Sequence, residues 1–197
     1  MGIEQLFETV SCQLTDPHEF LSRPAWYGLG ELDIGRLAEQ PSMELLRKVP
    51  WVRDDSELCE VGILRRKGIW FIFKTGEFYN KREFAPVDAQ VWIHSHPVWE
   101  GHPPDAISFF LPSINDFDYC LGNARNFVIS QDGLTEYWPI LINGERIRRS
   151  RINEVIREME IGDTNDEYMR FLNSVKAKFQ LYTWEELTSE RLAELLS

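Results

Sequence analysis

The stretch Ala89-Gln90-Val91-Trp92-Ile93-His94-Ser95-His96-Pro97 is the most informative part of this chain. Its first five residues form a short apolar run that predicts a buried strand. Residues i and i+2 of a strand project from the same face, so His94 and His96 can direct both imidazoles at one metal ion. Pro97 fixes a turn directly after the second histidine. The stretch therefore predicts two metal ligands held by strand geometry.

A second motif, Pro112-Ser113-Ile114-Asn115-Asp116, supplies a carboxylate. Ser, Asn and Asp are favoured at helix N-caps, which predicts that Ser113 and Asp116 lie in the first turn of a helix. Three residues apart, they share a face, so one can bind metal while the other reaches a substrate. Two imidazoles and a carboxylate suit Zn²⁺, and a catalytic zinc keeps a fourth position open for water. We therefore expect zinc bound by His94, His96 and Asp116.

The two motifs together resemble the signature of the JAMM metalloproteases of the MPN-plus (JAB domain) superfamily. That signature is an upstream Glu, then His-Ser/Thr-His-Pro, a short spacer and Ser-x-x-Asp. The matching residues here are His94, Ser95, His96, Pro97, Ser113 and Asp116. Residues 126–137 are similar to the strand, turn and strand that follow the motif helix in such domains, and their Asp-Gly is itself a hairpin signal. The resemblance covers about residues 55–140 and implies an α/β, MPN (JAB)-like mixed β-sheet flanked by helices.

The resemblance also implies an activity. In this interpretation zinc activates water and polarises the scissile carbonyl, and Ser113 stabilises the oxyanion. The implied substrate is the peptide or isopeptide bond after the C-terminal tail of ubiquitin or a ubiquitin-like protein. Two alternatives stay open, a noncatalytic MPN-type scaffold or binding module and a zinc hydrolase of a different amide.

Amide hydrolysis of this kind needs a carboxylate that moves a proton from water to the leaving amine. The family places a Glu near the start of a strand that leads into the sheet, and here Glu57 and Glu60 are both candidates. Glu57 follows a polar run and shares its alternate face with apolar residues, whereas Glu60 places Gly62 where several family members have a glycine. We favour Glu57 slightly, with Glu60 close behind.

The spacer between the two motifs departs from the family pattern. Sixteen residues, 97–112, separate His96 from Ser113, more than the family usually has. The stretch is aromatic and rich in proline, and it is interpreted as a loop over the site that acts as a lid or contacts substrate, or as a neutral surface insertion. His102 lies within it, but no spacing rule makes it a ligand.

Composition limits the classes of partner. The chain has 197 residues, 43% of them hydrophobic, which is enough to bury a full core. Its net charge of −11 opposes binding to nucleic acid or to an anionic membrane surface, and no apolar run reaches the length of a membrane span. The three cysteines are widely spaced and the N-terminus lacks the pattern of a signal peptide, so we expect a cytoplasmic protein.

The remaining segments predict helices around the motif region. Gly2–Leu14 and Ile34–Val49 carry helical spacing, whereas Val61–Arg66 and Ile69–Lys74 predict a hairpin with Lys-Gly at its turn. We expect a JAMM/MPN-like domain over residues 1–147 and a helical extension over 148–197 that packs on it or binds a protein partner or a second copy. The helices expected in the extension are Arg151–Glu160, Glu167–Phe179 and Glu185–Leu196.

Overall fold

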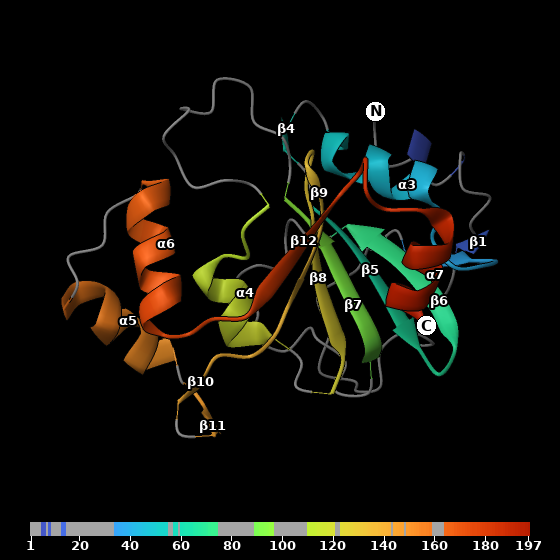
Figure 1. Ribbon diagram of the computed structural model, residues 1–197. Coiled ribbons are helices and arrows are strands. Elements are labelled where there is room, and N and C mark those ends of the chain that lie inside the picture. The colour runs from blue at the N-terminus through green and yellow to red at the C-terminus, as the bar shows by residue number, and fades with distance from the viewer. Residues whose placement is uncertain are drawn as a thin grey trace.

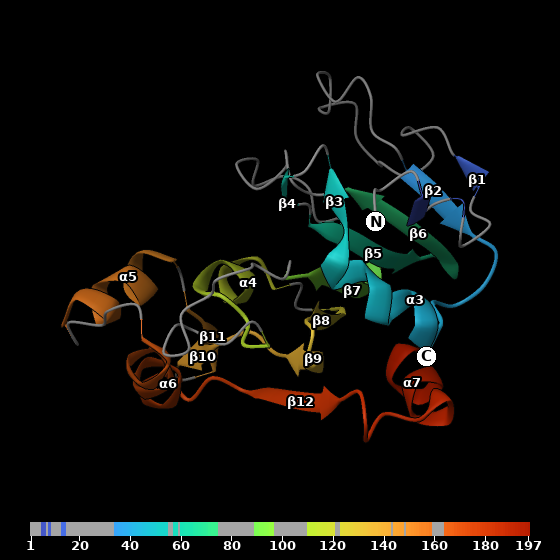
Figure 2. The same ribbon diagram turned by 90° about the horizontal axis from the view of Figure 1, so that it is seen from above.

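A mixed β-sheet forms the centre of the protein, with helices on both of its faces (Figures 1 and 2). The computed structural model describes residues 5–6, 8, 13–14, 34–54, 57–58, 60–74, 89–96, 110–120, 123–142, 144–147, 149–158 and 164–197. The eight strands of the sheet are, in spatial order, β1 (Gln13–Leu14), β2 (Ile34–Leu37), β6 (Ile69–Lys74), β5 (Val61–Arg66), β7 (Ala89–Ser95), β8 (Arg125–Ile129), β9 (Gly133–Tyr137) and β12 (Phe179–Thr183). Neighbouring strands are antiparallel except β7 and β8, which run parallel.

Short elements and helices complete the described part of the chain. Two small hairpins lie outside the main sheet, β3 (Arg53–Asp54) with β4 (Glu57–Leu58) and β10 (Leu141–Ile142) with β11 (Glu145–Arg146). The helices are α3 (Met43–Lys48), the 3-10 helix η2 (Val49–Trp51), α4 (Ile114–Tyr119), α5 (Arg149–Glu158), α6 (Asn165–Ser174) and α7 (Ser189–Leu196). Within the described ranges, no helix has the length and apolar character needed to cross a membrane. The predicted α/β class is confirmed as a mixed sheet with short helices, and the MPN-specific arrangement stays a prediction.

Strand alternation divides the apolar residues of the sheet between two cores. On one face, Ile63, Ile93 and Phe127 pack with α3 and α7. On the other face, Val128 and Tyr137 pack with α4, α5 and α6. Figure 2 shows these two helical groups on opposite sides of the sheet. Because side chains alternate along β7, His94 points toward the α4 side, opposite to its neighbour Ile93.

The predicted hairpin of β5 and β6 is confirmed with the predicted bounds. Lys67 has a φ of 50° and Gly68 a φ of 79°, both positive, as a two-residue type I′ turn requires. The predicted strands after the motif helix are also confirmed, as β8 and β9.

Two predicted helices at the N-terminal side are wrong in part. Ile34–Leu37 is strand β2 rather than helix, because it pairs with β6, and α3 starts only after Ser42, whose side chain accepts a hydrogen bond from the Leu45 N–H. Of Gly2–Leu14, residues 5, 6 and 8 are helical, but Gln13–Leu14 forms strand β1. In both segments, pairing with a neighbouring strand overrides the local helical pattern.

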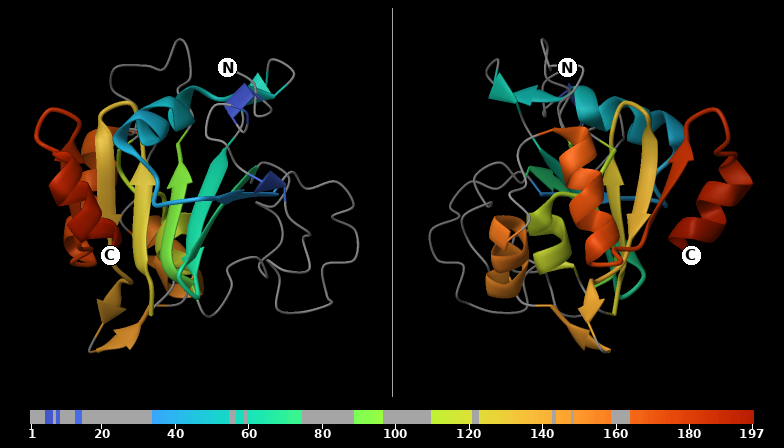
Figure 3. Two further views of the ribbon diagram at one scale, coloured as in Figure 1. Left: turned by 90° about the vertical axis from the view of Figure 1, so that its right-hand side faces the viewer. Right: turned by 60° about the vertical axis from the view of Figure 1, so that its left-hand side comes forward.

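The C-terminal segment also differs from its prediction. Helix α6 ends at Ser174, and Lys176 takes a φ of 52°, so the helix does not reach Phe179. Phe179–Thr183 is instead strand β12, which extends the sheet beyond β9 on its way from α6 to α7 (Figure 3). A Cβ on Gly133 would lie 2.2 Å from the Tyr182 carbonyl oxygen, so a glycine lets β12 approach. The C-terminal extension packs on the rest of the chain, while the domain boundary at residue 147 stays a prediction.

Candidate metal centre

The end of strand β7 positions the two histidines of the predicted site, because His94 lies in the strand and His96 directly follows its last residue, Ser95. The strand lies between β5 and β8 and continues through His94 and Ser95, which confirms and extends the strand predicted from the sequence. His94 is buried, and its ring centroid lies 5.2 Å from that of His96. Both imidazoles therefore lie on one side of the end of β7, as alternation predicts.

Helix α4 carries the carboxylate. Ser113 is its N-cap and Asp116 its third residue, which confirms the predicted placement at the start of a helix. The two residues form a capping box in which the Asp116 N–H donates to Ser113 Oγ at 3.2 Å. In return, the Ser113 N–H donates to Asp116 Oδ2 at 2.6 Å. The capping box thus fixes the position and orientation of the Asp116 carboxylate.

The fold brings these three side chains together. His94 Nε2 lies 3.0 Å from Asp116 Oδ1, and His96 Nε2 lies 3.2 Å from Asp116 Oδ2. One potential ligand atom from each residue lies within 4.8 Å of the other two. The side chains are only 5%, 15% and 6% exposed for His94, His96 and Asp116 respectively. This geometry could hold a metal ion between two nitrogens and an oxygen.

The hydrogen bonding of His94 also fits a metal ion. Neither ring nitrogen of His94 has an aligned hydrogen-bond partner among the described residues, although Nε2 approaches Asp116 closely. A buried polar nitrogen without a partner destabilises a fold. A metal ion would satisfy one of these nitrogens.

The electrostatics of Asp116 favour the ligand form. Burial alone raises the pKa of Asp116, because it disfavours the charged carboxylate. The charge and close polar contact of His94, and then of His96, outweigh burial and hold the pKa of Asp116 well below its usual value. Asp116 is therefore ionised, which is the state that binds a metal cation.

Ser95 lies between the two histidines along the strand and has a different environment. Its side chain is fully buried, and its Oγ accepts a hydrogen bond of 2.8 Å from the Val61 N–H at the start of β5. On the other side of β7, the His96 N–H donates to the Ile129 carbonyl oxygen at 2.8 Å. Both neighbouring strands thus hold the segment that carries the histidines.

The two acid/base candidates lie in different parts of the fold. Gly62 pairs with His94 across β5 and β7, so continuing the antiparallel register places Glu60 opposite His96 and on the same face. Because Gly62 has no side chain, it leaves space for the His94 imidazole beside it. Glu57 instead lies in β4, where it pairs with Asp54 in a hairpin outside the main sheet. The backbone position therefore favours Glu60 over Glu57, against the preference drawn from the sequence, and both roles stay predictions.

Some predicted features lie outside the described residues. The spacer from Pro97 to residue 109, with His102, is among them. Of the cysteines, only Cys120 is described, and it is buried.

Sequence reasoning missed two contacts that support the site. Tyr137 on β9 packs edge-on against His94, with ring centroids 6.3 Å apart. Tyr168 on α6 donates a hydrogen bond to the carbonyl oxygen of Pro112, 56 residues earlier in the chain. No local pattern marks either residue, because each meets the site only through tertiary packing.

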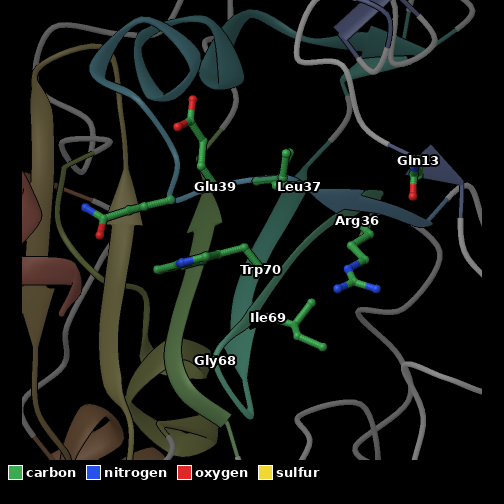
Figure 4. Close-up of a pocket in the computed structure, with 9 residues that line it drawn as sticks. Gln13, Arg36, Leu37, Glu39, Gly68, Ile69 and Trp70 are labelled. Atoms are coloured by element: carbon green, nitrogen blue, oxygen red, sulfur yellow. The ribbon is translucent and has the colours of Figure 1, made fainter.

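A separate hollow lies beside β1, β2 and the start of β6, near one edge of the sheet. It has a volume of about 510 Å³ and is bounded by residues that include Arg36, Glu39 and Trp70 (Figure 4). None of the three potential metal ligands lines it. The hollow is therefore distinct from the candidate metal centre.

Comparisons of the chain with known protein families, with curated proteins and with solved structures found no match.

Proposed function

We propose that this protein is a zinc-dependent, JAMM-type metallopeptidase that hydrolyses the peptide or isopeptide bond after the C-terminal tail of ubiquitin or a ubiquitin-like protein. One observation carries the proposal, the buried cluster of His94, His96 and Asp116 from two separate elements. The resemblance of the surrounding motifs to the JAMM signature suggests the ion and the class of substrate. We propose the cytoplasm as its location.

In this proposal, different residues bind the metal ion, transfer the proton and stabilise the oxyanion. His94, His96 and Asp116 hold the ion, and when bound, zinc supplies a Lewis acid that activates water and polarises a carbonyl oxygen. Glu60 accepts a proton as water adds to the carbonyl carbon, and then passes it to the amine nitrogen as the C–N bond breaks. The Ser113 hydroxyl oxygen accepts a hydrogen bond from the Asp116 N–H, so the Ser113 hydroxyl proton stays free to stabilise the oxyanion.

Metal content is the first test. Elemental mass spectrometry should find about one zinc per chain in the wild type, as a mononuclear site requires. Asp116→Asn should lose the metal, because an amide is a poorer ligand for zinc than a carboxylate. The matched control is Asp166→Asn, an exposed residue of α6 that should leave the zinc content unchanged. A wild type that takes up no metal when zinc is supplied would contradict the proposal.

Cleavage is the second test. Fusions at the C-terminal tail of ubiquitin or a ubiquitin-like protein should be cleaved faster than short peptides that lack the globular part. Glu60→Gln should keep zinc and lower the cleavage rate by about 10²- to 10⁴-fold, the usual contribution of general acid/base catalysis. Glu57→Gln is the paired variant. A larger loss of cleavage rate in Glu57→Gln than in Glu60→Gln would assign the acid/base role to Glu57. Faster cleavage of the short peptides would favour a hydrolase of another amide.

A further inference from the structure

Helix α6 reaches the peptide that precedes the Asp116 helix. Tyr168 is 2% exposed, and its hydroxyl donates a hydrogen bond of 2.5 Å to the Pro112 carbonyl oxygen. This carbonyl belongs to the same peptide group as the Ser113 N–H. That N–H donates to Asp116 Oδ2 at 2.6 Å. One peptide group therefore connects the Tyr168 hydroxyl to the carboxylate in an unbroken chain of hydrogen bonds.

Such a chain has two physical effects on the carboxylate. It fixes the plane of the Pro112–Ser113 peptide, because the carbonyl oxygen and the N–H point in opposite directions and both are bonded. It also polarises the peptide, since a donor on the carbonyl strengthens the hydrogen bond that the N–H makes. Both effects hold Asp116 Oδ2 toward His96, 3.2 Å away.

Helix α4 needs support of this kind. It has only six residues, too few for a stable helix without tertiary contacts. Its Phe117 belongs to the same buried core as Phe171 and Leu172 of helix α6. The start of α6 is itself fixed by a capping box between Thr164 and Glu167.

The tyrosine is held firmly as a donor. Its ring stacks against Phe171, with centroids 5.8 Å apart. Burial, and then the negative charge of Asp116, raise the pKa of Tyr168 above its usual value. The Tyr168 hydroxyl therefore stays protonated and can donate its hydrogen bond to the Pro112 carbonyl oxygen.

We propose that Tyr168 is a positioning residue of the metal centre, which orients the Pro112–Ser113 peptide so that its N–H holds the Asp116 carboxylate toward the two histidines. The inference rests on the proposed function, because it gives the C-terminal extension a part in binding the ion. It assigns to this extension a role in building the site as well as in covering the sheet.

The test compares two tyrosine variants of the full chain. Tyr168→Phe removes only the hydroxyl, and we expect the zinc dissociation constant, measured by competition with a chelator, to rise about tenfold, as for other outer-shell partners of metal ligands. Tyr182→Phe removes a hydroxyl that lies 3.4 Å from Glu136 Oε2 on β9, so it should leave zinc affinity unchanged. Circular dichroism should show both variants folded at the temperature of the assay.

A second measurement needs no metal. In the metal-free Tyr168→Phe protein, the amide proton of Ser113 should resonate upfield of its wild-type position, because its hydrogen bond to Asp116 weakens. In metal-free Tyr182→Phe, the same resonance should stay at its wild-type position. Unchanged zinc affinity and an unmoved Ser113 resonance in Tyr168→Phe would overturn the inference and leave the proposed function intact. A wild type that binds no zinc would overturn both, and the metal content of the wild type distinguishes the two failures.

Discussion

Ser95→Ala is the substitution whose effect follows most directly from the contacts of the metal centre. The Ser95 hydroxyl is the acceptor for the Val61 N–H, and both residues are fully buried. Alanine leaves this N–H without a partner and without access to water. An unsatisfied buried donor costs about 1 to 3 kcal/mol of the free energy of unfolding. For a chain of 197 residues, a loss of about 2 kcal/mol lowers Tm by about 4 to 8 °C.

Urea unfolding of the metal-free protein, followed by circular dichroism, measures this loss as a shift of the midpoint at constant slope. The matched control is Ser174→Ala, where an exposed hydroxyl donates to the Phe171 carbonyl and leaves no buried donor behind. We expect that control to stay within about 0.5 kcal/mol of the wild type. The reasoning is refuted if Ser95→Ala is no less stable than Ser174→Ala.

Three other predictions concern charge and protonation. Arg125→Ala should lower the free energy of unfolding, measured in urea, by about 3 kcal/mol, because it leaves the buried Glu136 carboxylate without the guanidinium that binds both of its oxygens. A decrease of less than about 0.5 kcal/mol would contradict this prediction. Asp116 should stay ionised when the metal-free protein is acidified through about pH 4, where a free aspartate takes up its proton, because the nearby His94 and His96 outweigh burial and hold the pKa of Asp116 well below its usual value. A carboxyl carbon resonance of Asp116 that titrates at about pH 4 would contradict this. Burial raises the pKa of Cys120 to about 12, so its thiol is neutral and unreactive at about pH 8 in the folded protein. Mass spectrometry of its peptide should show that iodoacetamide labels Cys120 in urea and not in the folded protein. Rapid labelling without urea would contradict this prediction.

The elements that the sequence predicted well are those fixed by near neighbours. The β5 and β6 hairpin follows from a two-residue turn whose backbone conformation glycine favours. The start of α4 follows from a serine that caps it, and the facing of His94 and His96 follows from strand alternation. Each of these features is set by a turn, a cap or an alternation that involves residues at most a few positions apart.

The elements that the sequence predicted wrongly depend on distant partners. Ile34–Leu37 has a helical pattern, yet it becomes strand β2 because β6 offers an edge to pair with. Phe179 is predicted to end a helix, yet Phe179–Thr183 becomes strand β12 because it pairs with β9 at the other edge of the sheet. The free energy of strand pairing and burial exceeds the small differences in local propensity.

The sequence by itself determined the identities of the three candidate ligands and the local geometry of each motif, because strand alternation and helix capping act over two or three residues. Only the tertiary structure decided that Asp116 meets His96 across 20 positions, that Gly62 pairs with His94, and that the Tyr168 hydroxyl donates a hydrogen bond to the Pro112 carbonyl oxygen. These contacts depend on the order of strands in the sheet and on which helix covers which face. That order is set by the burial of apolar surface from the whole chain, which no short stretch of sequence contains.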